Sequence, residues 1–437
     1  MNQTNDGTAE NPQQAERAGI SSAVAATVGL MWSPSTIALM GLGVFILPLQ
    51  AEFGWSRAQV VAVSMVINLT LLVMSPIQGY LVDRFGTRKV IVPSLGIFGT
   101  GLMLFYFLPG RLDAFYLGWA ALVAASVGLL PGGYLRVAGA WFNKRLGMAL
   151  GLVNSGIGWG NIFVPLVAST VITAYGWRMA YVVLGLIVLC VALPVCAVLL
   201  KERRSVGPES AEAKQTRKQT TARVFKETIR SRQFRTLVVA FFLLGLVNNA
   251  LINQQVPMLI DAGMTPQKAA FVQSMFGVFL LLGRIGAGIL LDRFSARWLM
   301  GIASIGAAIA CLIYSTGVTG NLVYLSAGLI GLVVGAEFDV LGYVIKRYFG
   351  MAAFGKTYGS IFSMFQLGGA IGSTSFAVSH DIFGSYQIGL YVAAAVLVFV
   401  CIAFTQLSKY PGEGGGDAGR ADAAPKTPGL QATSGAR

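Results

Sequence analysis

The chain has 437 residues, of which 55% are hydrophobic and only 11% are charged, and its formal net charge is +14. This composition excludes a water-soluble globular protein, because so few charged residues cannot cover its surface. We therefore expect an integral membrane protein, whose basic residues orient it in the bilayer and do not bind nucleic acid.

Apolar runs recur along the chain, each long enough to cross a bilayer of roughly 30 Å. They predict transmembrane helices and not barrel strands, because a helix satisfies its backbone internally whereas barrel strands alternate in shorter segments. The twelve predicted spans cover residues 23–50, 57–81, 88–108, 113–138, 146–170, 178–200, 234–260, 266–291, 297–316, 320–345, 354–378 and 384–407.

Polar segments divide these spans into two sets of six. Residues 1–20 form a polar tail without a basic-then-apolar signal pattern, so the first span is expected to be an uncleaved anchor. The last segment is rich in Gly, Ala and Pro, which predicts disorder. The predicted units are the tail 1–20, a first bundle 21–200, a linker 201–233, a second bundle 234–408 and a disordered tail 409–437.

Basic residues gather on one side of the predicted membrane. The loops after the even-numbered spans and the start of the last tail hold 22 Lys and Arg residues, whereas the opposite loops hold four. Basic loops stay in the cytoplasm, so both termini and the linker are expected there. A basic membrane-surface patch with its own ligand is the alternative for residues 201–235.

A short polar motif occurs twice, 209 positions apart, each time between two apolar spans. A repeat of this length indicates two homologous halves, an organisation that transporters use to place a substrate site between them. The first copy contains Gly79, Asp83, Arg84, Gly86, Arg88 and Lys89, and the second contains Gly288, Asp292, Arg293, Ser295 and Arg297.

The first copy resembles the Gly-x-x-x-Asp-Arg-x-Gly-Arg-Arg/Lys loop of the major facilitator superfamily. Within that superfamily, residues 141–151, 283–284 and 347–350 are similar to bacterial members of the monocarboxylate porter and oxalate:formate antiporter group. The resemblance covers about residues 20–408. It implies an all-α membrane protein, with twelve helices in two pseudo-symmetric six-helix bundles.

The charged residues of the repeated motif are predicted to gate the cytoplasmic side. Asp83 can face the positive N-terminus of a neighbouring helix while the arginines bind carboxylates or carbonyls. The alternative is that they only anchor the loops in the cytoplasm. The predicted gating residues are Asp83, Arg84, Arg88, Asp292, Arg293 and Arg297.

Arg284 lies within a predicted span, eight residues before Asp292, which places it roughly 12 Å inside the membrane. An intramembrane cation is a candidate functional residue, and a guanidinium can hold a carboxylate through two parallel hydrogen bonds. In the resembled group an arginine at this place takes part in anion binding. A permanent salt bridge between helices is the alternative.

Glu337 and Asp339 are candidate partners of Arg284 and candidate proton-coupling residues. If one of them releases Arg284 when protonated, proton binding and anion binding become linked. The two acids are two residues apart, about 200° around a helix, so they cannot face the same spot. Alternatively, both belong to a cytoplasmic gate with Lys346 and Arg347.

Further polar residues are candidates for substrate contact. Asn249 and Asn253 lie one turn apart on one face of their span and either bind substrate or hold helices together. Arg136 either adds positive potential to the cavity or extends to the membrane interface. The other candidates are Tyr134, Asn154 and Gln366.

We therefore expect a monomeric secondary transporter of the inner membrane that moves a small organic monoanion, aromatic acids included, by alternating access with proton symport. The oxalate exchanger of the resembled group has a lysine within span eleven, whereas Lys356 lies at the start of that span, so one carboxylate is expected. The alternatives are an anion exchanger, a proton-coupled exporter of organic compounds, or a transporter-like receptor. No enzyme site, catalytic residue, cofactor or metal site is expected, since no nucleophile, base or metal-ligand set is visible.

Overall fold

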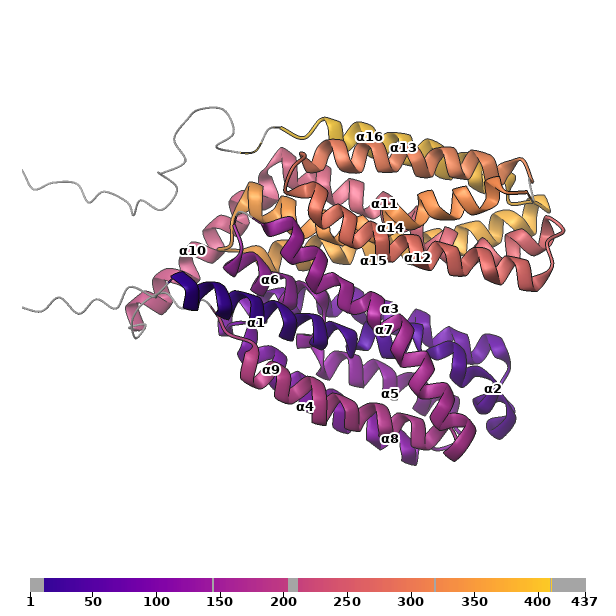
Figure 1. The fold of residues 1–437 in the computed structure, drawn as a ribbon, viewed down its shortest axis with the longest axis horizontal. Helices are drawn as coiled ribbons and strands as arrows, with labels where there is room; N and C mark the ends of the chain where they lie inside the picture. The colour runs from indigo at the N-terminus through magenta and orange to yellow at the C-terminus, as the bar shows by residue number, and fades with distance from the viewer. Residues whose placement is uncertain (1–11, 144, 203–210, 318–319, 409, 411–437) are drawn as a thin grey trace, which may run out of the picture. The chain divides into compact units, whose positions relative to one another are not determined.

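The computed structural model describes residues 12–143, 145–202, 211–317, 320–408 and 410 (Figure 1). In this part of the chain every regular element is helical. Eleven stretches among the described residues are long and apolar enough to cross a membrane, and Leu112–Ala125 is a shorter apolar helix. The expected all-α membrane fold is confirmed. The predicted disorder of residues 411–437 lies outside the described residues.

The first half of the chain consists of nine α-helices, several of them joined end to end by short 3₁₀ or π segments. These helices are α1 (Pro12–Met31), α2 (Leu42–Phe53), α3 (Arg57–Phe85), α4 (Thr87–Leu104), α5 (Leu112–Ala125), α6 (Pro131–Trp141), α7 (Leu146–Tyr175), α8 (Trp177–Ile187) and α9 (Leu193–Leu199).

The second half has six longer helices, preceded by one helix of the linker. The linker helix is α10 (Ala211–Arg230), and the six helices are α11 (Arg232–Asp261), α12 (Pro266–Leu291), α13 (Ala296–Ser315), α14 (Leu322–Phe349), α15 (Phe354–Phe383) and α16 (Gln387–Thr405).

Three predicted spans of the first half are interrupted. The span predicted at 113–138 leaves the α-helix after Ala125 and resumes at Pro131, the first residue of α6. Proline has no N–H to donate to the preceding turn, so it starts a helix readily but does not continue one. The spans predicted at 23–50 and 178–200 each contain a π-helical segment. In these three spans, regular α-helix therefore covers fewer residues than the apolar runs predicted.

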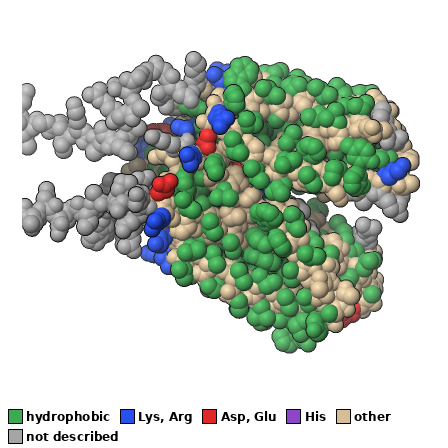
Figure 2. All heavy atoms as spheres, viewed as in Figure 1, with side chains coloured by type: hydrophobic (Ala, Val, Ile, Leu, Met, Phe, Trp, Pro, Cys, Tyr) green, Lys and Arg blue, Asp and Glu red, His purple; other side chains and the backbone are tan. Residues whose placement is uncertain are grey.

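The two halves meet mainly along two helix pairs, α3 with α15 and α7 with α12. Glycines allow this contact, because a Cβ on Gly79 would overlap the main chain of Gly355 and one on Gly147 would overlap that of Gly288. We call the end of the bundle that carries α10 the linker face. The halves converge there, and the space-filling view shows a hollow between them at the opposite face (Figures 1 and 2).

Candidate functional site

The contact between α3 and α15 is closed at the linker face by a buried carboxylate. Asp83, at the end of α3, accepts hydrogen bonds from the main-chain N–H groups of Gly355 at 3.1 Å and Lys356 at 2.9 Å. These are unsatisfied donors in the first turn of α15, where the helix dipole favours a negative charge. Asp83 therefore binds one half of the molecule to the other.

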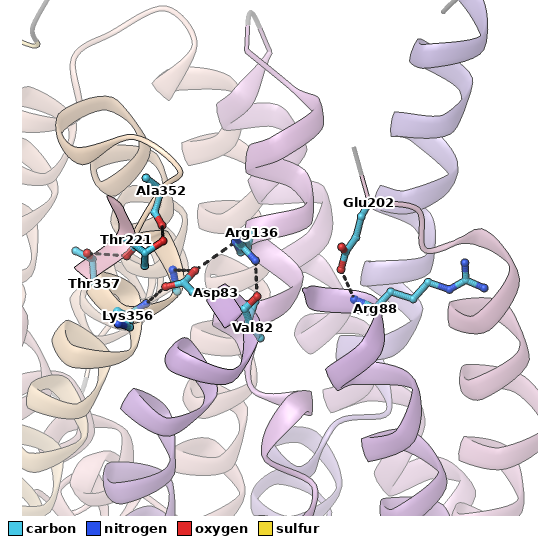
Figure 3. A network of polar contacts seen from close by, with 11 residues as sticks. Val82, Asp83, Arg88, Arg136, Glu202, Thr221, Ala352, Lys356 and Thr357 are labelled. Atoms are coloured by element: carbon cyan, nitrogen blue, oxygen red, sulfur yellow. Dashed lines mark hydrogen bonds and ion pairs between the residues drawn. The ribbon is translucent and has the colours of Figure 1, made fainter. Parts of the chain in front are cut away.

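Arg136 supports the same carboxylate from α6. Its Nε lies 3.5 Å from Asp83 Oδ1, and its Nη1 donates to the carbonyl of Val82 at 2.6 Å (Figure 3). The side chain of Arg136 therefore binds the end of α3.

The second copy of the motif makes the equivalent contact. Asp292, which follows α12, accepts hydrogen bonds from the N–H groups of Gly147 at 2.7 Å and Met148 at 3.0 Å in the first turn of α7. Lys346 adds a third connection, because its Nζ donates to the carbonyls of Gly139 at 2.5 Å and Phe142 at 2.6 Å near the end of α6. The linker face is thus closed at three places.

The arginines of the motif make contacts of a different kind. Arg84 donates to the hydroxyl of Tyr80 at 2.5 Å on its own helix, and Arg88 Nη2 donates to the carbonyl of Ala197 within the first half. The main-chain N–H of Arg88 also donates to Glu202 at 2.6 Å (Figure 3). These side-chain hydrogen bonds of the two arginines therefore stay within one half.

The arginines of the second copy also lie near the end of α12. The guanidinium of Arg297 is 5.9 Å from the ring centre of Trp298, and its Nε has no hydrogen-bond partner in the described part of the chain. Arg293 is exposed, and its main-chain N–H donates to Leu290. Among the predicted gating residues, the two aspartates make the bonds between the halves.

Arg284 lies at the centre of a buried polar group where α7, α12 and α14 meet. The residue is 4% exposed, and its Nη1 donates to the main-chain carbonyl of Asn154 at 2.9 Å. Its Nε has no partner among the described residues. In this part of the chain no carboxylate oxygen lies within 4.0 Å of the guanidinium, so the structure shows no salt bridge at this residue.

Glu337 and Asp339 are buried on opposite sides of α14. Glu337 accepts a hydrogen bond from Nδ2 of Asn248 at 2.6 Å, within the second half. Asp339 accepts one from Nδ2 of Asn154 in the first half, and its other oxygen, Oδ2, has no partner among the described residues. Both carboxylates lie close enough to act electrostatically on Arg284. Lys346 binds α6 and not these acids in the contacts described above.

The remaining polar candidates lie mainly in contacts between helices. Asn249 packs against Gly369 of α15, and Asn253 donates to Ser373 of α15 at 2.9 Å. Both therefore face α15. Gln366 donates to Asn68 of α3 at 3.1 Å and so joins the halves.

Tyr134 is fully buried within the first half. Its ring packs against Gly29 of α1, and its hydroxyl has no partner among the described residues. Tyr358, which the sequence analysis did not select, is buried on α15 and packs against Gly132 of α6, and its hydroxyl is also without a partner there. Tyr358 stacks with Phe354 and Phe362. In the sequence these three residues are spaced four apart and look like an aromatic stripe of the core, so nothing there marks Tyr358 as a polar residue of the site.

Two similar helical halves, closed against each other at one face and enclosing a buried cation and two buried acids, define a multi-pass membrane transporter. The chain belongs to the Major Facilitator Superfamily, whose family profile matches residues 28–262 and 250–435. The family and the fold are those of transporters and not of enzymes.

Two relatives of known class are similar to the chain. The chain is 25% identical over 313 residues to the MFS transporter asaE of Aspergillus flavus, covering 68% of this chain and 66% of that one. It is 24% identical over 277 residues to monocarboxylate transporter 12 of Homo sapiens, covering 58% of this chain and 53% of that one. The matches therefore span about two thirds and about half of these relatives.

Solved structures share the fold. The chain superposes on the transporter FucP in the outward conformation with a TM-score of 0.70 and 18% identity, covering 89% of this chain and 99% of that one. For the human organic anion transporter MFSD10 the TM-score is 0.69 and the identity 12%, covering 90% and 100%. At these identities the comparison shows the fold alone.

Proposed function

We propose that the protein carries a small organic monoanion, a monocarboxylate that can be aromatic, across the inner membrane by alternating access together with a proton. The observation that carries this proposal is that the guanidinium of Arg284 is buried and only partly hydrogen-bonded. A buried guanidinium with one hydrogen bond to a neutral carbonyl, and with Nε unpartnered among the described residues, has donors available for a ligand. A carboxylate matches such donors in charge and geometry.

The position of Lys356 supports a monoanion. Its main-chain N–H binds Asp83, and its Nζ lies 5.2 Å from the ring centre of Tyr80 and 5.6 Å from that of Phe225 of α10. This cation therefore belongs to the linker face. The similarity to monocarboxylate transporter 12 supports the same substrate class.

The two buried carboxylates support the proposed proton coupling. The cation Arg284 favours the charged form of a carboxylate beside it, and a bound anion offsets that effect. Protonation of one carboxylate then becomes more favourable. Binding of the anion therefore raises the affinity for the proton, and binding of the proton raises the affinity for the anion. Asp339 Oδ2, which has no hydrogen-bond partner among the described residues, can take up a proton without losing a described hydrogen bond.

Alternating access is supported by two of the three contacts that close the linker face. The bonds of Asp83 and Asp292 to helix N-termini must break for this face to open, and they can form again without any change in covalent structure. We place the linker face and both termini in the cytoplasm, because the basic loops lie there, and we propose that the transporter acts as a monomer in the bilayer.

Uptake of labelled monocarboxylates into proteoliposomes, under an imposed inward proton gradient, tests the proposal. The protein should accumulate at least one aliphatic or aromatic acid, an uncoupler should abolish accumulation, and Arg284→Gln should abolish transport of that acid while the protein remains folded. Flux that requires a second anion on the other side would replace symport by exchange. Full uptake by Arg284→Gln would remove the proposed anion site.

A further inference from the structure

Asn154 joins the two halves at the depth of Arg284. It belongs to α7 in the first half and is 0% exposed. Its main-chain carbonyl accepts a hydrogen bond from Arg284 Nη1 at 2.9 Å, and its side-chain Nδ2 donates to Asp339 Oδ1. Both partners belong to the second half, on α12 and α14. One residue of the first half is therefore bound by a cation and an acid of the second.

The backbones around these bonds are in close contact. A Cβ on Gly151 of α7 would lie 2.9 Å from the carbonyl oxygen of Arg284, and one on Gly335 of α14 would lie 2.9 Å from its main-chain nitrogen. With no side chain between the two backbones at Gly151, α7 cannot move away from α12 while both bonds of Asn154 persist. Separation of the halves at this depth requires both bonds to break.

The two bonds of Asn154 use the groups that would bind the ligands. A carboxylate bound to the donors of Arg284 that Asn154 does not use draws the guanidinium toward itself and away from the neutral carbonyl of Asn154, because the ionic bond is the stronger. A proton on Asp339 removes the charge that strengthens its bond to Asn154, and such bonds are roughly twice as strong as neutral ones. Each ligand therefore weakens one of the two bonds.

We propose that Asn154 is the positioning residue that links ligand occupancy to opening of the linker face, and that it contacts Arg284 and Asp339 instead of the substrate. With neither ligand bound, both bonds hold the halves together. With one ligand bound, the other bond remains and separation becomes only partly easier, and with both bound the halves separate readily. This inference rests on the proposed proton-coupled anion transport and explains why movement of one ligand alone would be suppressed.

The first test uses no substrate. Ser75, buried in the contact between α3 and α15, is replaced by Cys, and its modification by a maleimide is followed in nanodiscs by mass spectrometry, so that the native cysteines can remain. Asn154→Ala should raise the rate at residue 75 by at least about tenfold, because it removes the bond to Asp339. Asn154→Asp should raise the labelling rate more as the pH rises. Its carboxylate faces that of Asp339, with Glu337 and Arg284 nearby, and two charged carboxylates repel each other.

Asn161→Ala is the matched control, since this asparagine lies on the same face of α7, two turns away, and its Oδ1 has no partner among the described residues. Its labelling rate should equal that of the Ser75→Cys parent. Equal rates in the Asn154→Ala and parent proteins would overturn the inference, whichever substrate the protein carries.

The second test is proton-driven accumulation of a transported acid. Asn154→Ala should retain exchange of labelled for unlabelled acid but lose at least about tenfold in accumulation, while Asn161→Ala retains both. Unchanged accumulation by Asn154→Ala would overturn the inference. If wild-type protein accumulates no acid but Asn154→Ala still opens the linker face, the proposed function fails and the role of Asn154 in closure stands.

Discussion

Replacing Asp83 by Asn tests how strongly the repeated motif closes the linker face. The side chain of Asp83 is buried and binds two N–H groups of α15, at 3.1 Å and 2.9 Å, and the ion pair with Arg136 at 3.5 Å adds to this site. Asn has a similar shape but carries no charge and only one acceptor oxygen. Because the bonds join the halves, their loss changes the balance between closed and open conformations.

The size of the effect follows from the bonds lost. A hydrogen bond to a charged group contributes about 1.5–3 kcal/mol, and a charge at a helix terminus contributes about 0.3–1 kcal/mol. Two such bonds are lost, and the amide of the Asp83→Asn variant retains one neutral bond, so the net loss is at least about 2 kcal/mol. This corresponds to a shift of at least about 30-fold toward the open conformation.

Modification of Ser75→Cys in nanodiscs measures this shift. We expect the labelling rate to rise at least about 30-fold in Asp83→Asn, and the same replacement at Asp292 to have a similar, independent effect because it shares no partner with Asp83. Asp113→Asn is the control, since Asp113 is exposed and pairs with Arg111. A labelling rate within about twofold of the parent in both Asp83→Asn and Asp292→Asn would refute the proposed closure.

Three further predictions concern the contact between the halves and the central group. Gly79→Leu should prevent close approach of α3 and α15, because its side chain meets the main chain of Gly355, and labelling at residue 75 should then become fast. Arg284→Lys should keep the charge but lose bidentate binding, so the KM for a transported acid should rise by about tenfold or more, measured as initial uptake rates. Glu337→Gln and Asp339→Asn should retain exchange, and at least one of them should lose the stimulation of uptake by external acid. If uptake stays pH-dependent in both variants, neither residue is the proton site.

The fold was largely predictable because twenty-residue apolar runs have few alternatives in a bilayer. The interruptions were harder to place, since apolar composition is the same in α-, 3₁₀- and π-helical segments. The predicted span 113–138 ran through the break between α5 and α6, although Pro131, which starts α6, lacks the N–H that would continue a helix. The repeated motif indicated two related halves before any contact between them was known.

The candidate site was less predictable, because its contacts join residues far apart in the sequence. The predicted depths of Arg284 and Asp339 in their spans made them candidate partners, but nothing in the sequence places Asn154 between them. Arg136 shows the same difficulty, since its partner Asp83 lies on another helix. Helix register against a neighbour, which glycines such as Gly151 and Gly335 determine, sets these contacts.

Proton movement driven by the anion tests the central proposal most directly. Proteoliposomes containing a luminal pH dye receive a transported monocarboxylate from outside, with no imposed proton gradient, and protein-free liposomes correct for passive entry of the acid. We predict luminal acidification in step with anion uptake, and neither signal in Arg284→Gln. Anion uptake without acidification beyond that of protein-free liposomes would contradict proton-coupled transport of a monocarboxylate.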